Sequence, residues 1–498
     1  MNKKLLYKVS VFYACIGLFL LVGMGAFYVN WPGFYDHGEV NMASVSWLLE
    51  NGKPLYTELD ASTNYSLEHG PVIYLATAAM YHFFGASVLT AKLPGYLALL
   101  AGLLISFWGF ARKTGWQRAF CLLGMEAWVL LKWPFVFMNR DDSFMLLCVA
   151  AGFFFADRLR GPGHRWGMAL ALGVLINLKI HGGIYFLPVL VLYAKNHGWK
   201  NLLYVLGFSI FVVALPFLFP AISFWNYIGW LQQAAIHGFS WKLLLENITY
   251  TLLLAAMFWT VGELCRVRWK NFINLYKEEI IACFVAALCV NIVGAKHGSG
   301  NYHLIPLIPV WGYFISLLLQ EIPDRNRSGN HRKTGAIVFV VLLLLAAGSG
   351  INSERRLWEK MQNHPELNKI VAEIRDMEKF YQGKTIEIGY GGDRYYGEYR
   401  QFIPLLVFDG HPYLVDSATL MDTRLSGLKM SPAALRALED GTVQIWLIPH
   451  GAEPFSLHSY YHSSQFVFEE DFRNIFRQNY ALVKQGQYFD VWAYQGLK

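Results

Sequence analysis

The sequence predicts an α-helical polytopic membrane protein that ends in a small α/β domain. Hydrophobic residues make up 55% of the 498 residues, and charged residues make up only 15%, whereas an average soluble domain has roughly 25% charged residues. Long apolar runs recur through residues 1–350, while residues 351–498 are hydrophilic. This composition argues against a soluble protein and against an intrinsically disordered one.

The apolar runs are long enough to cross a membrane, which takes about 20 mostly apolar residues. We predict about eleven transmembrane helices, at 6–29, 88–111, 118–137, 143–159, 166–180, 182–194, 200–220, 243–265, 279–294, 303–320 and 334–350. The first lacks a small-residue cleavage site, so we interpret it as an uncleaved anchor rather than a signal peptide.

The distribution of basic residues predicts the orientation of these helices. If the N-terminus is cytoplasmic and 71–85 does not cross, 19 of the 26 basic residues in 1–350 lie in cytoplasmic loops, with 6 of the 16 acidic residues. These basic residues include Arg112, Arg158, Arg160, Arg325 and Arg327. A crossing at 71–85 would turn the later basic loops outward, against the positive-inside rule. We therefore predict an inner (plasma) membrane protein with an interfacial helix at 71–85.

In this orientation the C-terminal region is extracytoplasmic. Its pattern predicts helices at 368–381, 432–439 and 466–479 and strands at 385–390, 443–448 and 488–494, which together indicate an α/β domain. We thus expect a membrane domain at 1–350, with a large first outer loop at 30–87, and a soluble domain at 351–498.

The positions of the cysteines and of the basic residues indicate which ligands and partners to expect. All six cysteines lie in or beside apolar stretches, which is typical of small buried residues rather than of disulfides or metal sites. No basic stripe with interleaved aromatic residues is present, so we expect no nucleic-acid partner.

Two acidic clusters lie at predicted outer ends of helices. Asp36 and Glu39 are three residues apart, on one face if a helix begins there. Carboxylates at the membrane boundary can serve as a general base or a metal ligand, or they can simply cap a helix. Arg140, Asp141 and Asp142 separate two apolar helices and form either a functional cluster or an exposed polar turn.

A basic, glycine-containing loop lies on the same predicted side. It runs from Lys296 and His297 through two glycines to Tyr302 and His303. The glycines allow close approach of a ligand, and the basic residues supply charge for a phosphate. The spacing does not match a Walker loop. Lys179 forms a second basic spot on this side, next to His181.

Several aromatic and polar residues are candidates for an acceptor groove. They are Tyr56, Tyr65, Glu68, His69 and Tyr302. A purely structural role is the alternative for each of them.

The order of these features resembles a known family. The acidic first loop is followed by a turn ending in Tyr56, a Gly-Pro-x-x-Tyr segment at 70–74, a Phe-Phe-Gly at 83–85 and a Leu-Pro helix ending in Ala-Arg-Lys at 111–113. This order resembles the type C (GT-C) membrane glycosyltransferases, particularly protein O-mannosyltransferases and the lipid A aminoarabinose transferase. The loop at 296–306 looks like a late-loop pattern of bacterial relatives.

The resemblance implies a GT-C-like fold and an inverting hexosyl- or pentosyltransferase. Such an enzyme moves a sugar from a polyprenyl-phosphate donor to a lipid, glycan or protein acceptor on the periplasmic face. The family's first-loop aspartate, a catalytic base, matches Asp36. Many members have an adjacent Asp-Glu pair at this place, whereas Glu39 lies three positions after Asp36. The acidic residue that the family has in the second outer loop matches Asp141 or Asp142.

The resemblance also implies how the donor is held. Family lysines or arginines near the donor phosphate match Lys296 and Lys179, with His297, Arg140 and His303 as further candidates. Some members use a divalent cation such as Mg or Mn, which Asp36 would bind here, and others do not.

Two other classes compete with this interpretation. A polytopic transporter or lipid flippase of the cell envelope would have ionisable residues in the middle of its helices. The two halves of its membrane domain would also resemble each other. A catalytically silent scaffold would only present the C-terminal domain. The ionisable residues cluster at predicted outer helix ends, which favours the enzyme.

Overall fold

The computed structural model describes residues 3–157, 163–320, 330–362 and 366–497. The predicted cytoplasmic residues Arg158, Arg160, Arg325 and Arg327 lie outside the described residues. The chain divides into two compact units. Unit 1 comprises Met1–Asn30, Gly95–Pro216 and Phe239–Glu359, and unit 2 comprises Trp31–Pro94, Phe217–Gly238 and Lys360–Lys498.

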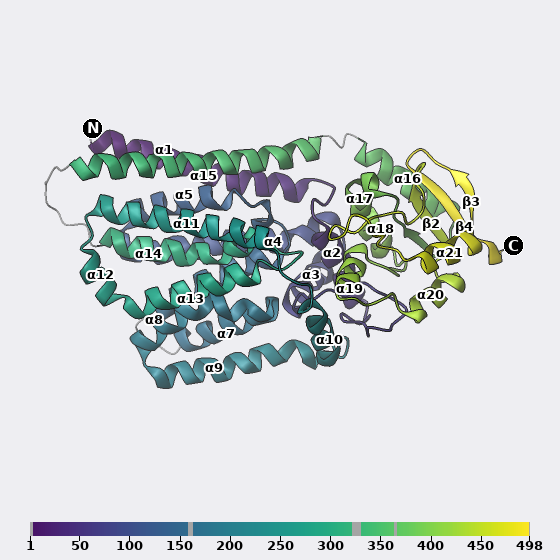
Figure 1. Cartoon of the computed structure of the whole chain (residues 1–498), viewed down its shortest axis with the longest axis horizontal. Helices are drawn as coiled ribbons and strands as arrows, with labels where there is room; N and C mark the ends of the chain where they lie inside the picture. The colour runs from purple at the N-terminus through teal and green to yellow at the C-terminus, as the bar shows by residue number, and fades with distance from the viewer. Residues whose placement is uncertain (1–2, 158–162, 321–329, 363–365, 498) are drawn as a thin grey trace. The chain divides into compact units, whose positions relative to one another are not determined.

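Unit 1 consists of helices that run side by side (Figure 1). They are α1 (Lys3–Asn30), the greater part of α4 (Val88–Thr114), α5 (Trp116–Leu130), α6 (Asp141–Ala156), α7 (Gly163–Leu178), α8 (Leu187–His197), α9 (Trp199–Ala214), α11 (Trp241–Cys265), α12 (Trp269–Leu275), α13 (Lys277–Val293), α14 (Ile308–Gln320) and α15 (Asn330–Gln362). Short 3₁₀ turns adjoin them: η1 (Pro134–Val136), η2 (Ile180–Phe186), η3 (Leu215–Leu218) and η4 (Asn301–Leu307).

Each of the eleven predicted apolar segments coincides with a helix. Among the described residues, six helices are long and apolar enough to span a membrane by length and composition. Other segments are shorter or interrupted, as at 118–137, where α5 ends at Leu130 and Pro134 begins η1. Proline lacks the amide hydrogen that continues a helix, so the chain turns there.

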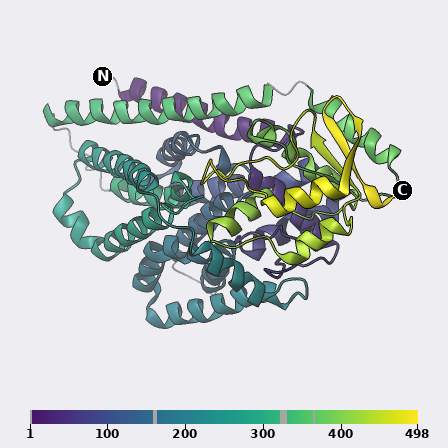
Figure 2. The same cartoon turned by 45° about the vertical axis from the view of Figure 1, so that its right-hand side comes forward.

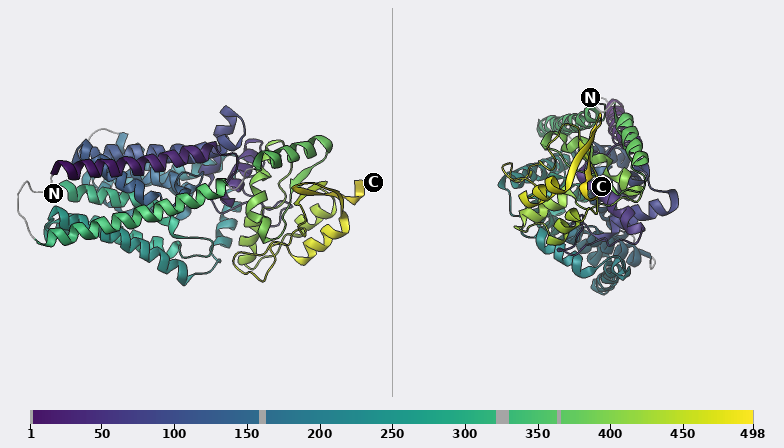
Figure 3. Two further views of the ribbon diagram at one scale, coloured as in Figure 1. Left: turned by 90° about the horizontal axis from the view of Figure 1, so that it is seen from above. Right: turned by 90° about the vertical axis from the view of Figure 1, so that its right-hand side faces the viewer.

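Helices α1 and α15 lie side by side and run parallel (Figure 3). The Tyr13 hydroxyl donates to the Leu343 carbonyl oxygen at 3.0 Å, and the rings of Phe27 and Trp358 lie 4.5 Å apart. The contacts advance in the same direction along both helices. Both helices therefore begin at the same end of unit 1, as the predicted topology requires.

Unit 2 combines short helices with a small sheet, drawn as yellow-green arrows in Figure 2. Its strands are β1 (Ile386–Ile388), β2 (Ile445–Pro449), β3 (Tyr480–Gln485) and β4 (Phe489–Tyr494), in the order β1-β2-β4-β3 with only β1 and β2 parallel. Its helices are α2 (His37–Glu50), α3 (Pro71–Phe84), α10 (Phe224–Ala234), α16 (Leu367–Phe380), α17 (Asp393–Tyr399), η5 (Arg400–Phe402), α18 (Ile403–Phe408), α19 (Ser417–Leu425), α20 (Pro432–Glu439), α21 (Glu470–Asn479) and η6 (Gln495–Leu497).

The predicted C-terminal helices at 368–381 and 432–439 and all three predicted strands are present. The predicted helix at 466–479 is wrong at its start, because the Val467 N–H donates to the Leu457 carbonyl and the helix begins only at Glu470. The sequence analysis missed β3, whose residues are mostly exposed and therefore lack an apolar pattern.

The first outer loop folds together with the C-terminal region in unit 2, which differs from a division at residue 350. The Asn64 N–H donates to the Leu414 carbonyl at 2.7 Å, and the Asn64 carbonyl accepts the Asp416 N–H at 2.8 Å. Segment 217–238 joins the same unit, since the Trp230 indole donates to the Thr57 carbonyl at 2.9 Å. Hydrogen bonds between backbone segments so far apart in the chain leave no local sequence pattern from which they could be predicted.

A buried carboxyl in β1 predicts a pH-dependent stability. Glu387 is 2% exposed, and burial raises its pKa to about 8 although the N–H groups of Leu414 and Val415 donate to it. The folded state therefore binds more protons than the unfolded state between pH 4.5 and about 8, so this group makes stability fall as pH rises through that window. We expect the melting temperature of purified Glu387→Gln to fall less than that of the wild type as pH rises from 4.5 to about 8. An equal fall in the variant and the wild type would contradict this.

Candidate functional site

Asp36 caps the helix that starts the first outer loop. It lies at the N-cap of α2, and one carboxylate oxygen accepts the Gly38 N–H at 3.0 Å. The His37 ring nitrogen Nδ1 lies 3.4 Å from the other oxygen. Aspartate is a favoured N-cap, and the helix dipole stabilises its charge. The capping bond therefore orients a buried carboxylate, so capping and a chemical role are compatible here.

Glu39 lies in the first turn of the same helix and belongs to a buried charge pair. Its carboxylate acts electrostatically on Lys92, and neither side chain is more than 1% exposed. The Lys92 ammonium donates to the Trp31 carbonyl at 2.7 Å and lies 5.2 Å from the Trp31 ring and 5.4 Å from the Phe34 ring. Glu39 and Lys92 are thus buried beside the loop that carries Asp36, and a catalytic role for Glu39 stays a prediction.

Lys92 is a further candidate site residue that was not predicted from the sequence. The available signal was a lysine near the start of a predicted apolar helix, where an ionisable group needs a partner. Two cations of the C-terminal region on which the Asp36 charge acts, Lys360 and Arg400, were also not predicted. Nothing local in the sequence connects these residues with the first loop.

The predicted groove residues of the first loop are mainly packing residues. The hydroxyls of Tyr56 and Tyr65 are bonded to the carbonyls of His69 (2.7 Å) and Pro54 (2.9 Å), and both side chains are buried. These hydrogen bonds join separate parts of the first outer loop. Glu68, like His69, is partly exposed on this loop, and a groove role for this pair stays a prediction.

A second charged cluster lies in unit 1, at the start of α6. Arg140 Nε lies 3.2 Å from Asp142 Oδ2, and Lys179 Nζ lies 3.8 Å from Asp141 Oδ2. Arg140 and both aspartates are buried, so the alternative of an exposed polar turn is wrong. Acidic residues in the first turn of α6 are favoured by its dipole, and the two cations balance them.

The basic loop that precedes η4 adds aromatic rings to this cluster. The Tyr302 ring lies 4.9 Å from the Arg140 guanidinium carbon and 5.8 Å from Lys179 Nζ, and it stacks on His303 at 4.8 Å. The charges of Lys179 and Lys296 both act on His181. His297 adjoins Lys296 and is partly exposed. Three predicted cations from three separate loops are thus gathered in unit 1.

Close backbone packing supports the unit 1 cluster. A Cβ at Gly182 would collide with the Leu175 carbonyl oxygen, so the η2 turn after Lys179 requires glycine. A Cβ at Gly95 would collide with the Met138 carbonyl oxygen, just before Arg140. Both glycines let the cluster's backbone lie directly against a neighbouring helix.

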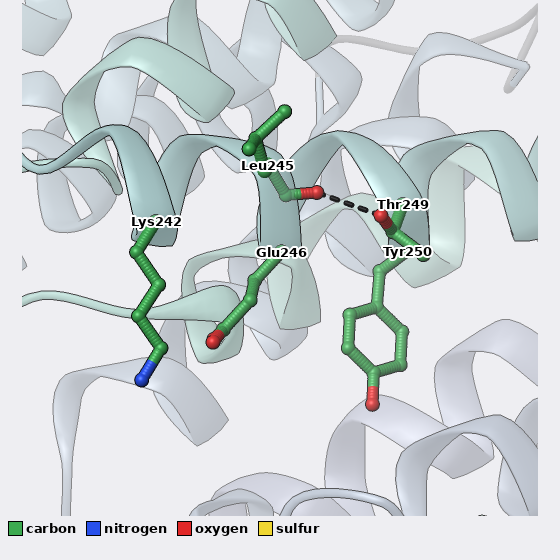
Figure 4. A pocket seen from close by; sticks show the side chains of 5 residues that line it. All are labelled: Lys242, Leu245, Glu246, Thr249 and Tyr250. Atoms are coloured by element: carbon green, nitrogen blue, oxygen red, sulfur yellow. Dashed lines mark hydrogen bonds between the residues drawn. The ribbon is translucent and has the colours of Figure 1, made fainter.

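A pocket of about 580 Å³ lies along one face of α11 (Figure 4). Its wall contains Lys242, Leu245, Glu246, Thr249 and Tyr250. The Thr249 hydroxyl donates to the Leu245 carbonyl at 2.7 Å.

The pocket is linked to the basic loop by aromatic contacts. The Tyr250 ring lies 5.7 Å from the Trp133 ring, whose indole N–H donates to Asn301 Oδ1 at 2.7 Å. Side-chain contacts thus connect the pocket wall with Asn301, the residue before Tyr302 in the basic loop.

The residues around Asp36 do not fit a metal held by protein ligands alone. Within the described part of the chain, no group of three or more His, Cys, Asp or Glu side chains could hold a metal ion. Glu39, the nearest second carboxylate in sequence, interacts with Lys92.

No protein-family model matches this sequence, and no curated protein matches it in sequence. Among solved structures, it is similar to ArnT from Cupriavidus metallidurans bound to undecaprenyl phosphate, with a TM-score of 0.58, 13% identity and 97% of each chain covered. Apo ArnT gives 0.57, 14% and again 97% of each chain. An oligosaccharyltransferase from Archaeoglobus fulgidus gives 0.45 and 11%, with 89% of this chain and 68% of that chain covered. The two ArnT structures confirm the expected GT-C-like fold over nearly the whole chain.

Proposed function

We propose that this protein is a membrane glycosyltransferase that moves a sugar from a polyprenyl-phosphate-linked donor to a lipid, glycan or protein acceptor. The observation that carries the proposal is the likeness, over 97% of both chains, to ArnT bound to undecaprenyl phosphate. The oriented and buried carboxylate of Asp36 supports it, because sugar transfer to a hydroxyl needs a base.

Asp36 is the proposed base. Its carboxylate takes the proton of the acceptor hydroxyl while that oxygen forms a bond to the anomeric carbon. The bond from this carbon to the phosphate oxygen breaks, and the lipid phosphate leaves with the electron pair. A single displacement of this kind inverts the anomeric configuration. The Gly38 amide holds one oxygen of the base in place.

The unit 1 cluster is the proposed site for the donor phosphate. Arg140, Lys179 and Lys296 supply three positive charges, and Asp141 and Asp142 supply two negative ones. The surplus charge suits an anionic group that gains charge as it leaves. His297, His303 and Tyr302 lie on the same loop.

We expect Lys296→Ala to weaken binding of undecaprenyl phosphate by about 1–3 kcal/mol, the scale of a lost charged hydrogen-bond partner. The affinity is measured by titrating the purified full-length protein in detergent. Lys270→Ala, at an exposed position of α12, is the matched control and should bind normally. Equal affinity of the Lys296→Ala variant and the wild type would remove Lys296 from the phosphate site.

The proposed location is the inner membrane, with a cytoplasmic N-terminus and an extracytoplasmic C-terminal region. The six long apolar helices and the gathering of basic residues in predicted cytoplasmic loops support it. The sugar would then be transferred on the outer face.

Mass spectrometry of envelope lipids and glycans tests the proposal. A strain that lacks the gene should lose one component whose mass exceeds that of its acceptor by a hexose- or pentose-sized sugar, and expression of the wild-type chain should restore it. Identical envelope components with and without the gene would contradict the proposed function.

A further inference from the structure

The C-terminal part of unit 2 places two cations near one carboxylate. Lys360 lies at the end of α15, and Arg400 begins η5. The Asp36 charge acts on both, and the two cations also act on each other. Another acid of this neighbourhood, Asp393, accepts hydrogen bonds from His458. Two cations thus share this neighbourhood with two carboxylates.

Arg400 has unused hydrogen-bonding capacity. Its guanidinium carbon lies 4.2 Å from the centre of the Tyr396 ring, a cation–π contact. Among the described residues, the buried Nη1 atom has no hydrogen-bond partner. Buried donors without partners are rare in native proteins, and a bound ligand is one common explanation. Lys360 donates to the Tyr35 carbonyl at 3.1 Å, which uses one of its three donors.

Two further contacts position the residues around Arg400. A Cβ at Gly33 would collide with Gln401 Oε1, so the loop that carries Asp36 touches η5 directly. The Tyr396 hydroxyl accepts a hydrogen bond from Ser417 at 3.2 Å, which holds the ring under the guanidinium.

The same place is open to solvent on one side. The Tyr460 ring meets the Tyr396 ring edge-on at 5.3 Å, and Tyr460 is 65% exposed. Tyr460 thus connects the Tyr396 ring with solvent, and its hydroxyl is a further donor.

We propose that Arg400 and Lys360 form a binding site for a phosphate group in the C-terminal part of unit 2. A planar guanidinium can donate two parallel hydrogen bonds to phosphate, and the ammonium adds a second positive charge. The site differs from the unit 1 cluster of Arg140, Lys179 and Lys296. It deepens the proposed function and rests on that function for its occupant. The occupant is a phosphate on the acceptor, or the phosphate of the lipid donor bound here in place of the unit 1 cluster.

The test measures binding to the purified full-length protein in detergent with three probes: undecaprenyl phosphate, undecaprenol and inorganic phosphate. We expect Arg400→Gln to weaken phosphate binding by roughly 10- to 100-fold, as for a lost charged hydrogen bond. Undecaprenol, which lacks the phosphate, should bind equally to both proteins. Arg394→Gln is the matched control, because Arg394 is an exposed arginine of the adjoining α17.

The probes distinguish the two sources of phosphate. A loss of undecaprenyl phosphate binding in Arg400→Gln assigns the site to the lipid donor. A loss confined to inorganic phosphate assigns it to a phosphate on the acceptor. Unchanged binding of both phosphate probes overturns the site.

Further variants keep the test valid if Arg400→Gln does not fold. Arg400→Lys, which keeps the charge but loses the planar fork, and Lys360→Gln should each weaken phosphate binding, and normal binding in both would also overturn the site. The phosphate-binding measurement does not depend on sugar transfer by the protein. A protein that binds phosphate through Arg400 but adds no sugar to the envelope would contradict only the proposed function.

Discussion

Replacing Asp36 with asparagine is expected to lower sugar transfer by about 10²- to 10⁴-fold, the usual contribution of a general base. The amide cannot accept the proton of the acceptor hydroxyl. Asparagine is as good an N-cap as aspartate, so the bond from the Gly38 N–H to the side chain should persist. The variant should therefore fold like the wild type while losing activity.

The measurement compares strains that lack the gene and express either chain. The sugar-bearing envelope component is quantified by mass spectrometry and divided by the amount of protein in the membrane, and melting temperatures of the purified proteins report folding. Asp60→Asn, an exposed acid of the same outer loop, is the control and should be fully active. Wild-type levels of product from Asp36→Asn would show that another group is the base.

Replacing Arg140 with leucine should destabilise unit 1 by about 3 kcal/mol. The change removes one partner of a buried ion pair and leaves the carboxylate of Asp142 poorly compensated, which typically costs 3–5 kcal/mol. The nearby charge of Lys179 also acts on Asp142, so we expect the lower end of this range.

A double variant tests the cause of that loss. Arg140→Leu combined with Asp142→Asn removes both charges and should recover most of the lost free energy of unfolding in a denaturant titration. Arg165→Leu, at an exposed position of α7, is the control and should have little effect. If the single and double variants are equally destabilised, the two side chains are not coupled and the ion pair is not the cause.

Local sequence patterns predicted residues of both charged clusters but not their surroundings. Asp36 was found because an acid directly before a helix start is a local pattern, and its capping bond is equally local. Lys296 and Lys179 were found as basic residues on the predicted outer side. That they belong to one cluster depends on how loops more than one hundred residues apart pack, which no local pattern records.

The missed residues share one physical property. Lys92, Lys360 and Arg400 matter because of the charge that each one faces, and each lies more than fifty positions from its partner in the chain. Two tyrosines of the first loop show the same dependence on tertiary structure. Tyr56 and Tyr65 have the residue type of a binding groove, but their hydroxyls are bonded to backbone carbonyls within a folded loop.

The sequence by itself determined the helical membrane class, the positions of the apolar segments and the α/β character of the C-terminal region. These follow from apolarity and periodicity within about 20 neighbouring residues. Only the tertiary structure decided that the first outer loop folds with the C-terminal region, and that Asp36 faces Arg400 and Lys360. Burial and charge pairing depend on which distant segments pack together, because a buried charge is stable only beside a compensating partner.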